Sequence, residues 1–439
     1  MTLISKLFTL KKSKTQPHIQ FGRYCDAYKS DEQLGFWDSA VNQYSKEKYI
    51  DSFQFLLQFL KEPTLNNVEW TQANGKLQFK LYQGSKLIEG EVTAIHSFVV
   101  AKIARFSQKE VGWMRILLEE NYNMTYSRFA INDNQEIIIV FDNYMEEALP
   151  HKMYEALREL SVRADKIDDI LLSEFGQLEP IQNDHIFQLN AKIVEAKYLF
   201  FKKKTNQVLQ NINLPTANMN AFTGSFMYMI LACAYCIDYL VKPEGALMKN
   251  IEHCHRGYFN DQAEDVDAKT STLIQNFREV ASISESEIKK ELYESRSTFG
   301  LDLPTGLQGL REIIEAQWSD LDWFLDNNYL DVHRFVCDYV VGFSLFSFAL
   351  PSPYKDILRL YYQVTENDYF ISLGYEKHFL KNGILLKKDI IKEIQNIKVF
   401  KNSPGQEINF DTKVLIFDDL PQFCHSFLLM VKLSILREL

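Results

Sequence analysis

The sequence predicts an α+β protein in which an N-terminal helical hairpin and a sheet-containing module precede a mainly α-helical C-terminal region. Two changes in the spacing of apolar residues lead to this prediction. Apolar residues recur at helical spacing over residues 31–62 and alternate with polar residues from residue 68 onward, as in strands that bury one face. From residue 186 the spacing is again mainly helical, and prolines separate the segments.

The composition narrows the class of protein. A chain of 439 residues corresponds to two or three domains, and its 46% hydrophobic content excludes a disordered protein. Only 17 residues are glycine, which favours a helix-rich binding protein over an enzyme with glycine-rich phosphate loops. The net charge of −10 excludes a general nucleic-acid-binding protein, because such a protein needs a basic surface.

The cysteines predict a reducing compartment. They are too sparse for a disulfide framework, and most lie among apolar residues, so we expect buried, reduced thiols in a cytoplasmic protein. The six are Cys25, Cys233, Cys236, Cys254, Cys337 and Cys424.

Two segments, residues 1–14 and 222–241, raise the alternative that the protein is a membrane-associated scaffold. Residues 1–14 lack the pattern of a secretory signal, and they form either an amphipathic arm for a membrane or partner groove or a segment packed on the protein's own body. We expect the second, with residues 1–30 as a flexible N-terminal arm. Residues 222–241 are long enough to span a bilayer, but Asp238 would be costly there, which favours a buried helix.

The helical hairpin is expected over residues 31–62. Trp37, Ala40 and Tyr44 share a helical face in the first helix, and a second apolar helix ends before Pro63. This pattern resembles one tetratricopeptide hairpin. We find no second copy, and such repeats need neighbours to bury their faces.

A sheet is expected next. The Asn74-Gly75 pair predicts a tight hairpin turn, and the run from residue 87 to 106 predicts one long strand or two short ones. A helix over 108–121 should direct Val111, Met114, Leu117 and Leu118 inward. Strands over 125–131 and 136–142 and a long helix from Leu149 to Leu171 complete an α-β-β-β-α-β-β-α module, which ends at about residue 175. With the hairpin, it spans residues 31–175.

The remaining chain is expected to be a mainly helical domain over 186–366 and a small mixed α/β segment over 367–439. Helices are predicted over 186–200, 218–241, 264–281, 284–295, 307–326, 330–349 and 353–366. Strand-like runs follow at 369–375, 396–400 and 412–417, and a closing helix is expected over 420–436.

Residues 46–175 resemble the YbjN-like and type III secretion chaperone-like family. The resemblance lies in the helix that begins GWMRILLEENY, the strand pair Tyr126–Ile131 and Ile137–Phe141, and the long helix from Leu149. It implies a fold that holds another polypeptide, and therefore a non-enzymatic adaptor or chaperone-like protein with a protein partner. The resemblance does not extend to residues 186–439.

Aromatic residues of this module are the candidates for partner contact, because aromatic side chains supply much of the binding energy at interfaces. The candidates are Trp70, Phe79, Tyr82, Trp113 and Phe129. The alternative is that they fill the module's own core.

A zinc site is the sharpest chemical alternative. Cys233, Cys236, Cys254 and His255 could supply four ligands for a zinc-dependent enzyme or a zinc-stabilised protein. The cysteine pair lies inside an apolar helix with no turn between the thiols, which favours buried core cysteines. We therefore expect no metal and no cofactor.

No catalytic residue can be assigned. Asp261, Glu264, Asp265 and Asp267 lack the spacing of a calcium loop and suit a helix N-terminus instead. Asp320, Asp322 and Asp326 could be paired carboxylates, but a solvated helix face explains them. The glycine-rich phosphate loops, zinc-protease and serine-hydrolase motifs are all absent.

Overall fold

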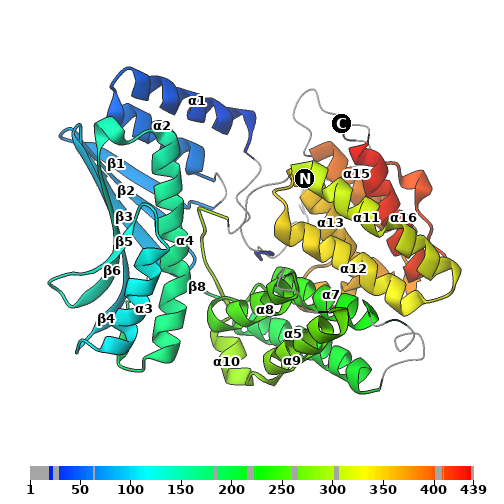
Figure 1. Ribbon diagram of the computed structural model, residues 1–439. Helices are drawn as coiled ribbons and strands as arrows, with labels where there is room; N and C mark the ends of the chain where they lie inside the picture. The colour runs from blue at the N-terminus through cyan, green and yellow to red at the C-terminus, as the bar shows by residue number, and fades with distance from the viewer. Residues whose placement is uncertain are drawn as a thin grey trace, which may run out of the picture.

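The computed structural model describes residues 19–22, 29–62, 65–181, 185–214, 222, 224–259, 265–300, 306–400, 408 and 410–436. Two units are visible in Figure 1: a sheet module (residues 29–181) and a helical half (residues 185–436). Each has its own cluster of buried hydrophobic side chains. The α+β class is confirmed. Of the flexible arm expected over residues 1–30, residues 1–18 and 23–28 lie outside the described residues, whereas Ile19 and Phe21 are buried in the core of the helical half.

The hairpin consists of α1 (Asp31–Ser45) and α2 (Tyr49–Leu60). Helix α1 begins with a capping box, in which Ser30 and Gln33 satisfy each other's backbone N–H groups. The Trp37 ring then packs on Phe59 of α2 and on Tyr154 of α4 (Pro150–Glu174), with ring centroids 5.0 and 6.0 Å apart. The hairpin therefore buries its apolar face against α4 rather than against further repeats.

The sheet is antiparallel along the order β1-β2-β3-β4-β6-β5, and the short β7 (Leu178–Pro180) pairs with one end of β4. Its strands are β1 (Val68–Ala73), β2 (Lys76–Gln83), β3 (Lys86–Val92), β4 (His96–Phe106), β5 (Arg128–Ile131) and β6 (Glu136–Tyr144). The run from residue 87 to 106 thus forms two strands, because the Thr93 hydroxyl accepts hydrogen bonds from the N–H groups of Ile95 and His96 and closes a turn. Four strands therefore precede α3 (Val111–Tyr122).

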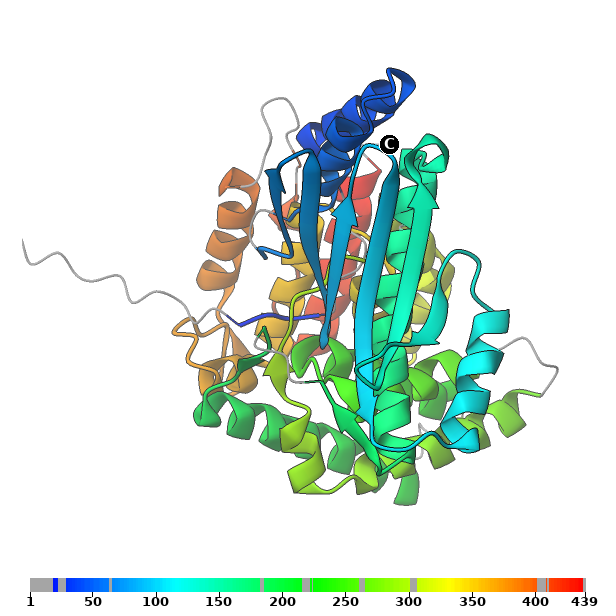
Figure 2. The same cartoon turned by 90° about the vertical axis from the view of Figure 1, so that its left-hand side faces the viewer.

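The helices α1, α2 and α4 lie on one side of this sheet, and its other side faces the viewer without a helix in front of it in Figure 2. On the covered side, Leu77, Leu81 and Ile139 are fully buried against the α4 residues Leu157 and Leu160. The outward-pointing side chains of β2, β3 and β4 are polar or only partly buried, whereas the outward-pointing Ile138 and Val140 of β6 are buried. The sheet therefore presents one free face.

The helical half is built from eleven described α-helices. They are α5 (Ala191–Asn213), α7 (Gly224–Leu240), α8 (Gly245–Tyr258), α9 (Val266–Ser282), α10 (Glu285–Lys290), α11 (Gly306–Asp326), α12 (Leu330–Ser347), α13 (Ser352–Thr365), α14 (Asn367–Ser372), α15 (Lys387–Phe400) and α16 (Leu420–Ile435). The apolar helix α7 lies in the core of this half, as expected for residues 222–241. Among the described residues, no helix has the length and hydrophobicity needed to cross a membrane.

The strand-like runs of the C-terminal segment were predicted wrongly. Residues 369–375 fall largely in α14, where Tyr369, Phe370 and Leu373 face the core at helical spacing, so packing overrides their strand propensity. Residues 396–400 end α15. Residues 412–417 contain a 3₁₀ turn, Thr412–Val414. The Ile416 N–H donates to the Ser426 hydroxyl at 3.0 Å instead of pairing with a strand.

The described strands of this half are two-residue pairs. Strand β10 (Leu380–Lys381) pairs with β11 (Ile384–Leu385), and β8 (Phe187–Gln188) pairs with β9 (Tyr293–Glu294). Helix α8 was not anticipated, and α10 is shorter than the predicted 284–295.

A strap of the helical half (residues 293–300) joins the two units. The Phe299 side chain belongs to the core of the sheet module and packs on Tyr154 with ring centroids 5.6 Å apart. The Gln83 amide donates to the Phe299 carbonyl at 3.1 Å and accepts from its N–H at 2.9 Å. The strap therefore adds both apolar burial and backbone hydrogen bonds to the module.

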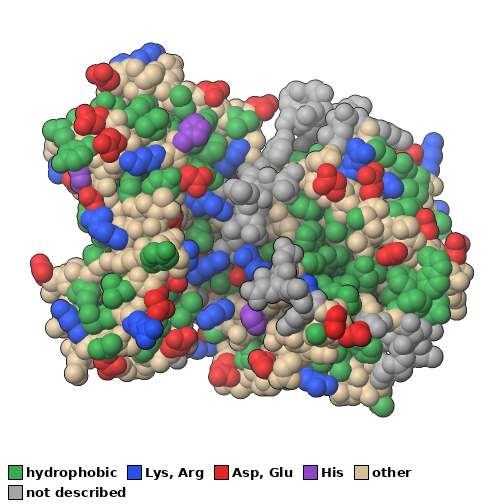
Figure 3. Space-filling model, viewed as in Figure 1, with side chains coloured by type: hydrophobic (Ala, Val, Ile, Leu, Met, Phe, Trp, Pro, Cys, Tyr) green, Lys and Arg blue, Asp and Glu red, His purple; other side chains and the backbone are tan. Residues whose placement is uncertain are grey.

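Charged side chains also gather between the units, where Figure 3 shows a row of Lys and Arg side chains. The ion pair between Lys86 and Asp168 is almost completely buried, with 2% and 4% of the two side chains exposed. Burial, together with the charges of Asp168 and Glu244, raises the pKa of the nearby Asp165 to about 8. Burying like charges together is costly, so this region of the joint is sensitive to protonation.

Candidate functional site

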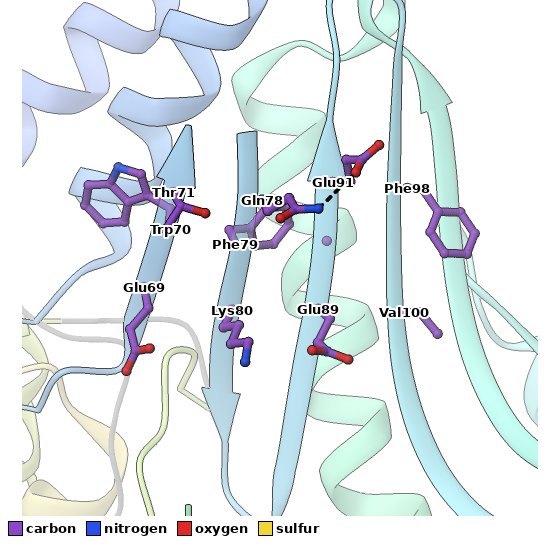
Figure 4. A pocket seen from close by; sticks show the side chains of 11 residues that line it. Glu69, Trp70, Thr71, Gln78, Phe79, Lys80, Glu89, Glu91, Phe98 and Val100 are labelled. Carbon is purple, nitrogen blue, oxygen red and sulfur yellow. Dashed lines mark hydrogen bonds between the residues drawn. The ribbon is translucent and has the colours of Figure 1, made fainter. Parts of the chain in front are cut away.

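The free face of the sheet carries a hollow of about 600 Å³ across β1, β2, β3 and β4 (Figure 4). This volume lies within the range of ligand-binding clefts. The residues that line it are Glu69, Trp70, Thr71, Gln78, Phe79, Lys80, Glu89, Gly90, Glu91, Phe98 and Val100.

The strand register places the charged residues of the hollow in one row. Glu69 lies opposite Lys80, and Lys80 lies opposite Glu89 on the next strand. Directly opposite residues on one face have neighbouring side chains, so the Lys80 side chain lies between those of Glu69 and Glu89. Figure 4 shows these three side chains along the same side of the hollow.

A second row runs from Gln78 through Glu91 to Phe98. Glu91 is held in place, because Lys76 bonds one of its carboxylate oxygens at 2.7 Å and Gln78 the other at 3.2 Å. These hydrogen bonds lower the pKa of Glu91, so it is ionised at neutral pH. The Phe98 ring, 43% of whose residue surface is exposed, ends this row.

The lining has a surplus of negative charge, because three glutamates face one lysine, Lys80. Glu91 is neutralised by Lys76, and Arg296 of the strap lies 3.7 Å from the carboxylate of Glu69. No ion pair to Glu89 is found among the described residues. Glu89 is therefore the carboxylate in the hollow best able to take a cation from outside.

The apolar part of the hollow continues along the sheet. Val100 lies beside Phe98 on the same face of β4, and its cross-strand partner on β6 is Val140. On the covered face, the Phe79 ring passes beneath Gly90, where an added Cβ would lie 2.1 Å from a ring carbon. The backbone of β3 is thereby fixed under the hollow by close packing.

The structure separates the five aromatic residues that the sequence suggested for partner contact. Phe79, Tyr82, Trp113 and Phe129 are buried in the described structure, and only Trp70 offers part of its ring, under the ammonium group of Lys61. Phe79 and Trp70 contribute to the lining of the hollow although, as cross-strand partners, they point to the covered face. Tyr82 instead stacks on the Arg296 guanidinium at 3.8 Å. Trp113 and Phe129 fill the module's core near α3.

Sequence reasoning missed Phe98 and Glu89. The signal was present, because Phe98, Val100 and Lys102 alternate with buried residues along β4 and so share its outer face. The sequence alone does not show that this face of the sheet is left uncovered by the described helices.

A second exposed surface lies on α3. Its inward residues are Trp113 and Leu117, whereas Val111, Met114 and Leu118 point outward, contrary to the prediction that they face inward. With Tyr122 they form the α3 stripe, whose members have 83%, 36%, 70% and 91% of their surface exposed in chain order. Apolar residues lie on both sides of α3, and the side that carries Trp113 is the buried one. An exposed apolar row of this kind marks an interaction surface.

The alternative zinc ligands lie on two core helices. Cys233 and Cys236 are buried in α7, and Cys254 and His255 are buried in α8. Burial raises the pKa of the Cys254 thiol to about 12, which disfavours the thiolate that zinc needs. The described residues contain no group of three or more His, Cys, Asp or Glu placed to hold a metal ion.

The acidic clusters have structural partners. Asp265 caps α9 by accepting the Ala268 N–H at 2.7 Å, and Asp261 and Glu264 lie outside the described residues. On α11, Asp322 contacts the His425 ring at 3.2 Å, while no shared site with Asp320 or Asp326 is formed in the described structure.

Comparison with protein-family models and with curated proteins finds no match to this chain. The resemblance of residues 46–175 to the secretion chaperone-like family therefore stays a prediction.

Proposed function

We propose that the protein is a non-enzymatic adaptor whose sheet module binds a segment of a partner polypeptide in the hollow of its free face. The observation that carries this proposal is the hollow itself, an open depression of about 600 Å³ with exposed Phe98 beside a row of charged side chains. Apolar contact next to fixed charges is what a specific protein interface requires. The compartment proposed is the cytoplasm.

The sheet geometry favours an amphipathic helix as the bound segment. Strands β2, β3 and β4 are paired on both sides, so the hollow offers side chains but few free backbone groups. A bound segment must then satisfy its own backbone hydrogen bonds, which a helix does. Its apolar residues would cover Phe98 and Val100.

The charge of the lining specifies a basic residue on that helix. Glu89 has no ion-pair partner among the described residues, lies directly opposite the apolar Val100 and is one row from Phe98. A Lys or Arg flanked by apolar residues would therefore fit the hollow, whereas an acidic segment would be repelled.

Selection of helical peptides on the full-length protein tests this proposal. A display library with one randomised helix face should yield peptides that combine apolar residues with Lys or Arg. The Glu89→Lys and Phe98→Ser variants should each weaken the selected peptides about tenfold or more, since each removes a central contact. Fluorescence anisotropy measures the affinities.

Two control variants locate the contact. Glu155→Lys makes the same charge change on an exposed position of α4 and should leave binding unchanged. The double variant Val111→Ser, Leu118→Ser alters only the α3 stripe. If this double variant weakens binding while Glu89→Lys does not, the hollow is not the binding site.

A further inference from the structure

The helical half contains a second, separate cavity of about 330 Å³ between α5, α7 and α12. Figure 1 shows α7 lying between the other two helices. The walls come from residues 204–211 of α5, 229–233 of α7 and 331–338 of α12. Unlike the hollow on the sheet, this site lies between helices from three parts of the chain, with Gln207, Gln210 and Asp331 exposed at its rim, and its size suits a small molecule.

The α12 wall has a distinctive order of side chains. Asp331, Phe335 and Asp338 follow one another at intervals of four and three residues, so they lie on one helix face. An aromatic ring is thus placed between two carboxylates. Carboxylates and the face of an aromatic ring both attract an ammonium group.

The other two walls differ in character. Gln207, Gln210 and Asn211 of α5 bring carboxamides to the cavity, and these side chains make no hydrogen bond within the described part of the chain. Met229 and Ala232 of α7 form an apolar floor. The cavity therefore offers an apolar surface on one side and unused hydrogen-bonding groups on another.

The charges at the base of the cavity are fixed by each other. Lys204 donates to Glu366 at 2.9 Å, while Asp338 accepts from Arg334 at 2.8 Å and from the Tyr361 hydroxyl at 2.7 Å. Buried ion pairs contribute little stability compared with apolar packing, but they hold side chains in one orientation. The carboxylate of Asp338 is thereby positioned before any ligand arrives.

One negative charge is left over. Lys204 and Arg334 balance Glu366 and Asp338, and the remaining carboxylate, Asp331, forms no ion pair with another described residue. Its place in the first turn of α12 is favourable for the helix dipole, but this leaves its oxygens free to bind. The surplus disfavours an anionic ligand.

We propose that this cavity binds a small organic ammonium compound. The ammonium group binds the Asp331 carboxylate against the Phe335 ring, and the carbon chain covers Met229 and Ala232. The carboxamides of α5 bind any further polar group of the ligand. This activity is separate from partner binding by the sheet module.

Isothermal titration calorimetry of the full-length protein with putrescine, ethanolamine and choline tests the proposal. At least one of these ammonium probes should bind with one-to-one stoichiometry. Butane-1,4-diol, which has the length of putrescine without its charges, and succinate should bind at least tenfold more weakly. Absence of binding by all three ammonium probes would overturn the proposal, as would equal binding of the diol.

Three variants link the binding to this cavity. Asp331→Asn should weaken the best probe about tenfold or more, because it removes a charged hydrogen-bond acceptor. Phe335→Leu should weaken it several-fold by removing the ring. Asp320→Asn makes the same charge change on an exposed position of α11 outside the cavity and should have no effect. Circular dichroism confirms that each variant is folded, and an unchanged affinity in folded Asp331→Asn protein would show that the cavity is not the site.

Discussion

The hollow of the sheet module and the cavity of the helical half differ in the side chains that surround them. The module leaves apolar residues at its surface, in the hollow at Phe98 and on the α3 stripe (Val111, Met114, Leu118 and Tyr122). Around the cavity of the helical half, charged side chains are instead mostly buried, namely those of Lys204, Arg334 and Asp338.

This difference suggests two kinds of recognition in one chain. An exposed apolar surface is suited to a macromolecule, which covers it on binding, whereas a buried set of oriented charges is suited to a small ligand that enters between helices. The strap at residues 293–300 qualifies the comparison, because it places Phe299 of the helical half in the module's core.

The largest expected effect on stability comes from removing the Phe299 side chain of the strap. Phe299→Ala should lower the free energy of unfolding by about 4 kcal/mol, because it removes a buried ring and leaves a cavity beside Tyr154. Denaturant unfolding followed by tryptophan fluorescence and by circular dichroism measures the loss. One shared transition at lower denaturant would show that the strap couples the two units.

Two separated transitions, of which only the first shifts, would instead show that the module unfolds by itself. Phe259→Ala is the matched control, since this exposed phenylalanine lies in the helical half and its loss should cost little. A fall of less than 1 kcal/mol for Phe299→Ala would contradict the packing seen here.

The next effect concerns the buried histidine of the helical half. Burial, together with His425 3.2 Å away and Arg334, lowers the pKa of His333 to about 4 against the opposing charges of Asp338 and Asp419. Its thiol neighbour is Cys337. The unfolded chain takes up this proton near pH 6.5, so stability is present above that pH and is lost as the pH falls toward 4.

The titration of His333 should therefore lower the free energy of unfolding by about 3 kcal/mol as the pH falls from 7 to 4. Denaturant titrations at several pH values measure the slope. Because other groups also titrate, the comparison is with His333→Asn, whose stability should fall less steeply with acid. Parallel slopes for the two proteins would mean that His333 is protonated in the fold.

The sequence predicted the elements of the sheet module better than their surroundings. Alternation along β2 and the Asn74-Gly75 turn determine a hairpin locally, and the structure contains it. Which side of α3 is buried could not be predicted from the sequence. Val111, Trp113 and Leu118 are all apolar, and the position of the sheet determines which of them are buried.

The candidate sites show the same limit. Asp331, Phe335 and Asp338 form a regular helical pattern, but the sequence does not reveal that α5 and α7 leave a cavity opposite them. The strands predicted late in the chain were wrong for a related reason, because the packing of Tyr369 and Phe370 in α14 outweighed their strand propensity.

A smaller effect is expected at the joint between the units. Because Asp165 has a pKa raised to about 8, it holds a proton in the folded state that the unfolded chain has lost, and the fold is penalised increasingly as the pH rises from 4 to 8. Asp165→Asn should therefore be about 2 kcal/mol more stable at pH 9 and nearly neutral at pH 4. The asparagine oxygen keeps the hydrogen bond from the Ser85 N–H, which is 3.0 Å long.

Thermal unfolding of both proteins at pH 4, 7 and 9 measures the difference. Asp267→Asn serves as the control, since Asp267 is exposed on α9 away from this carboxylate cluster. A destabilised Asp165→Asn variant at pH 9 would show that the carboxylate is ionised and satisfied in the folded protein.

The smallest effect on stability should come from the α3 stripe, and it tests the comparison most directly. Val111 and Leu118 are 83% and 70% exposed, so the double variant Val111→Ser, Leu118→Ser should change the free energy of unfolding by no more than about 0.5 kcal/mol. The same variant should reduce any self-association seen by sedimentation velocity, because it removes exposed apolar surface. A loss of more than 1 kcal/mol would mean that the stripe packs within the chain and that the module, like the helical half, uses its apolar residues for folding.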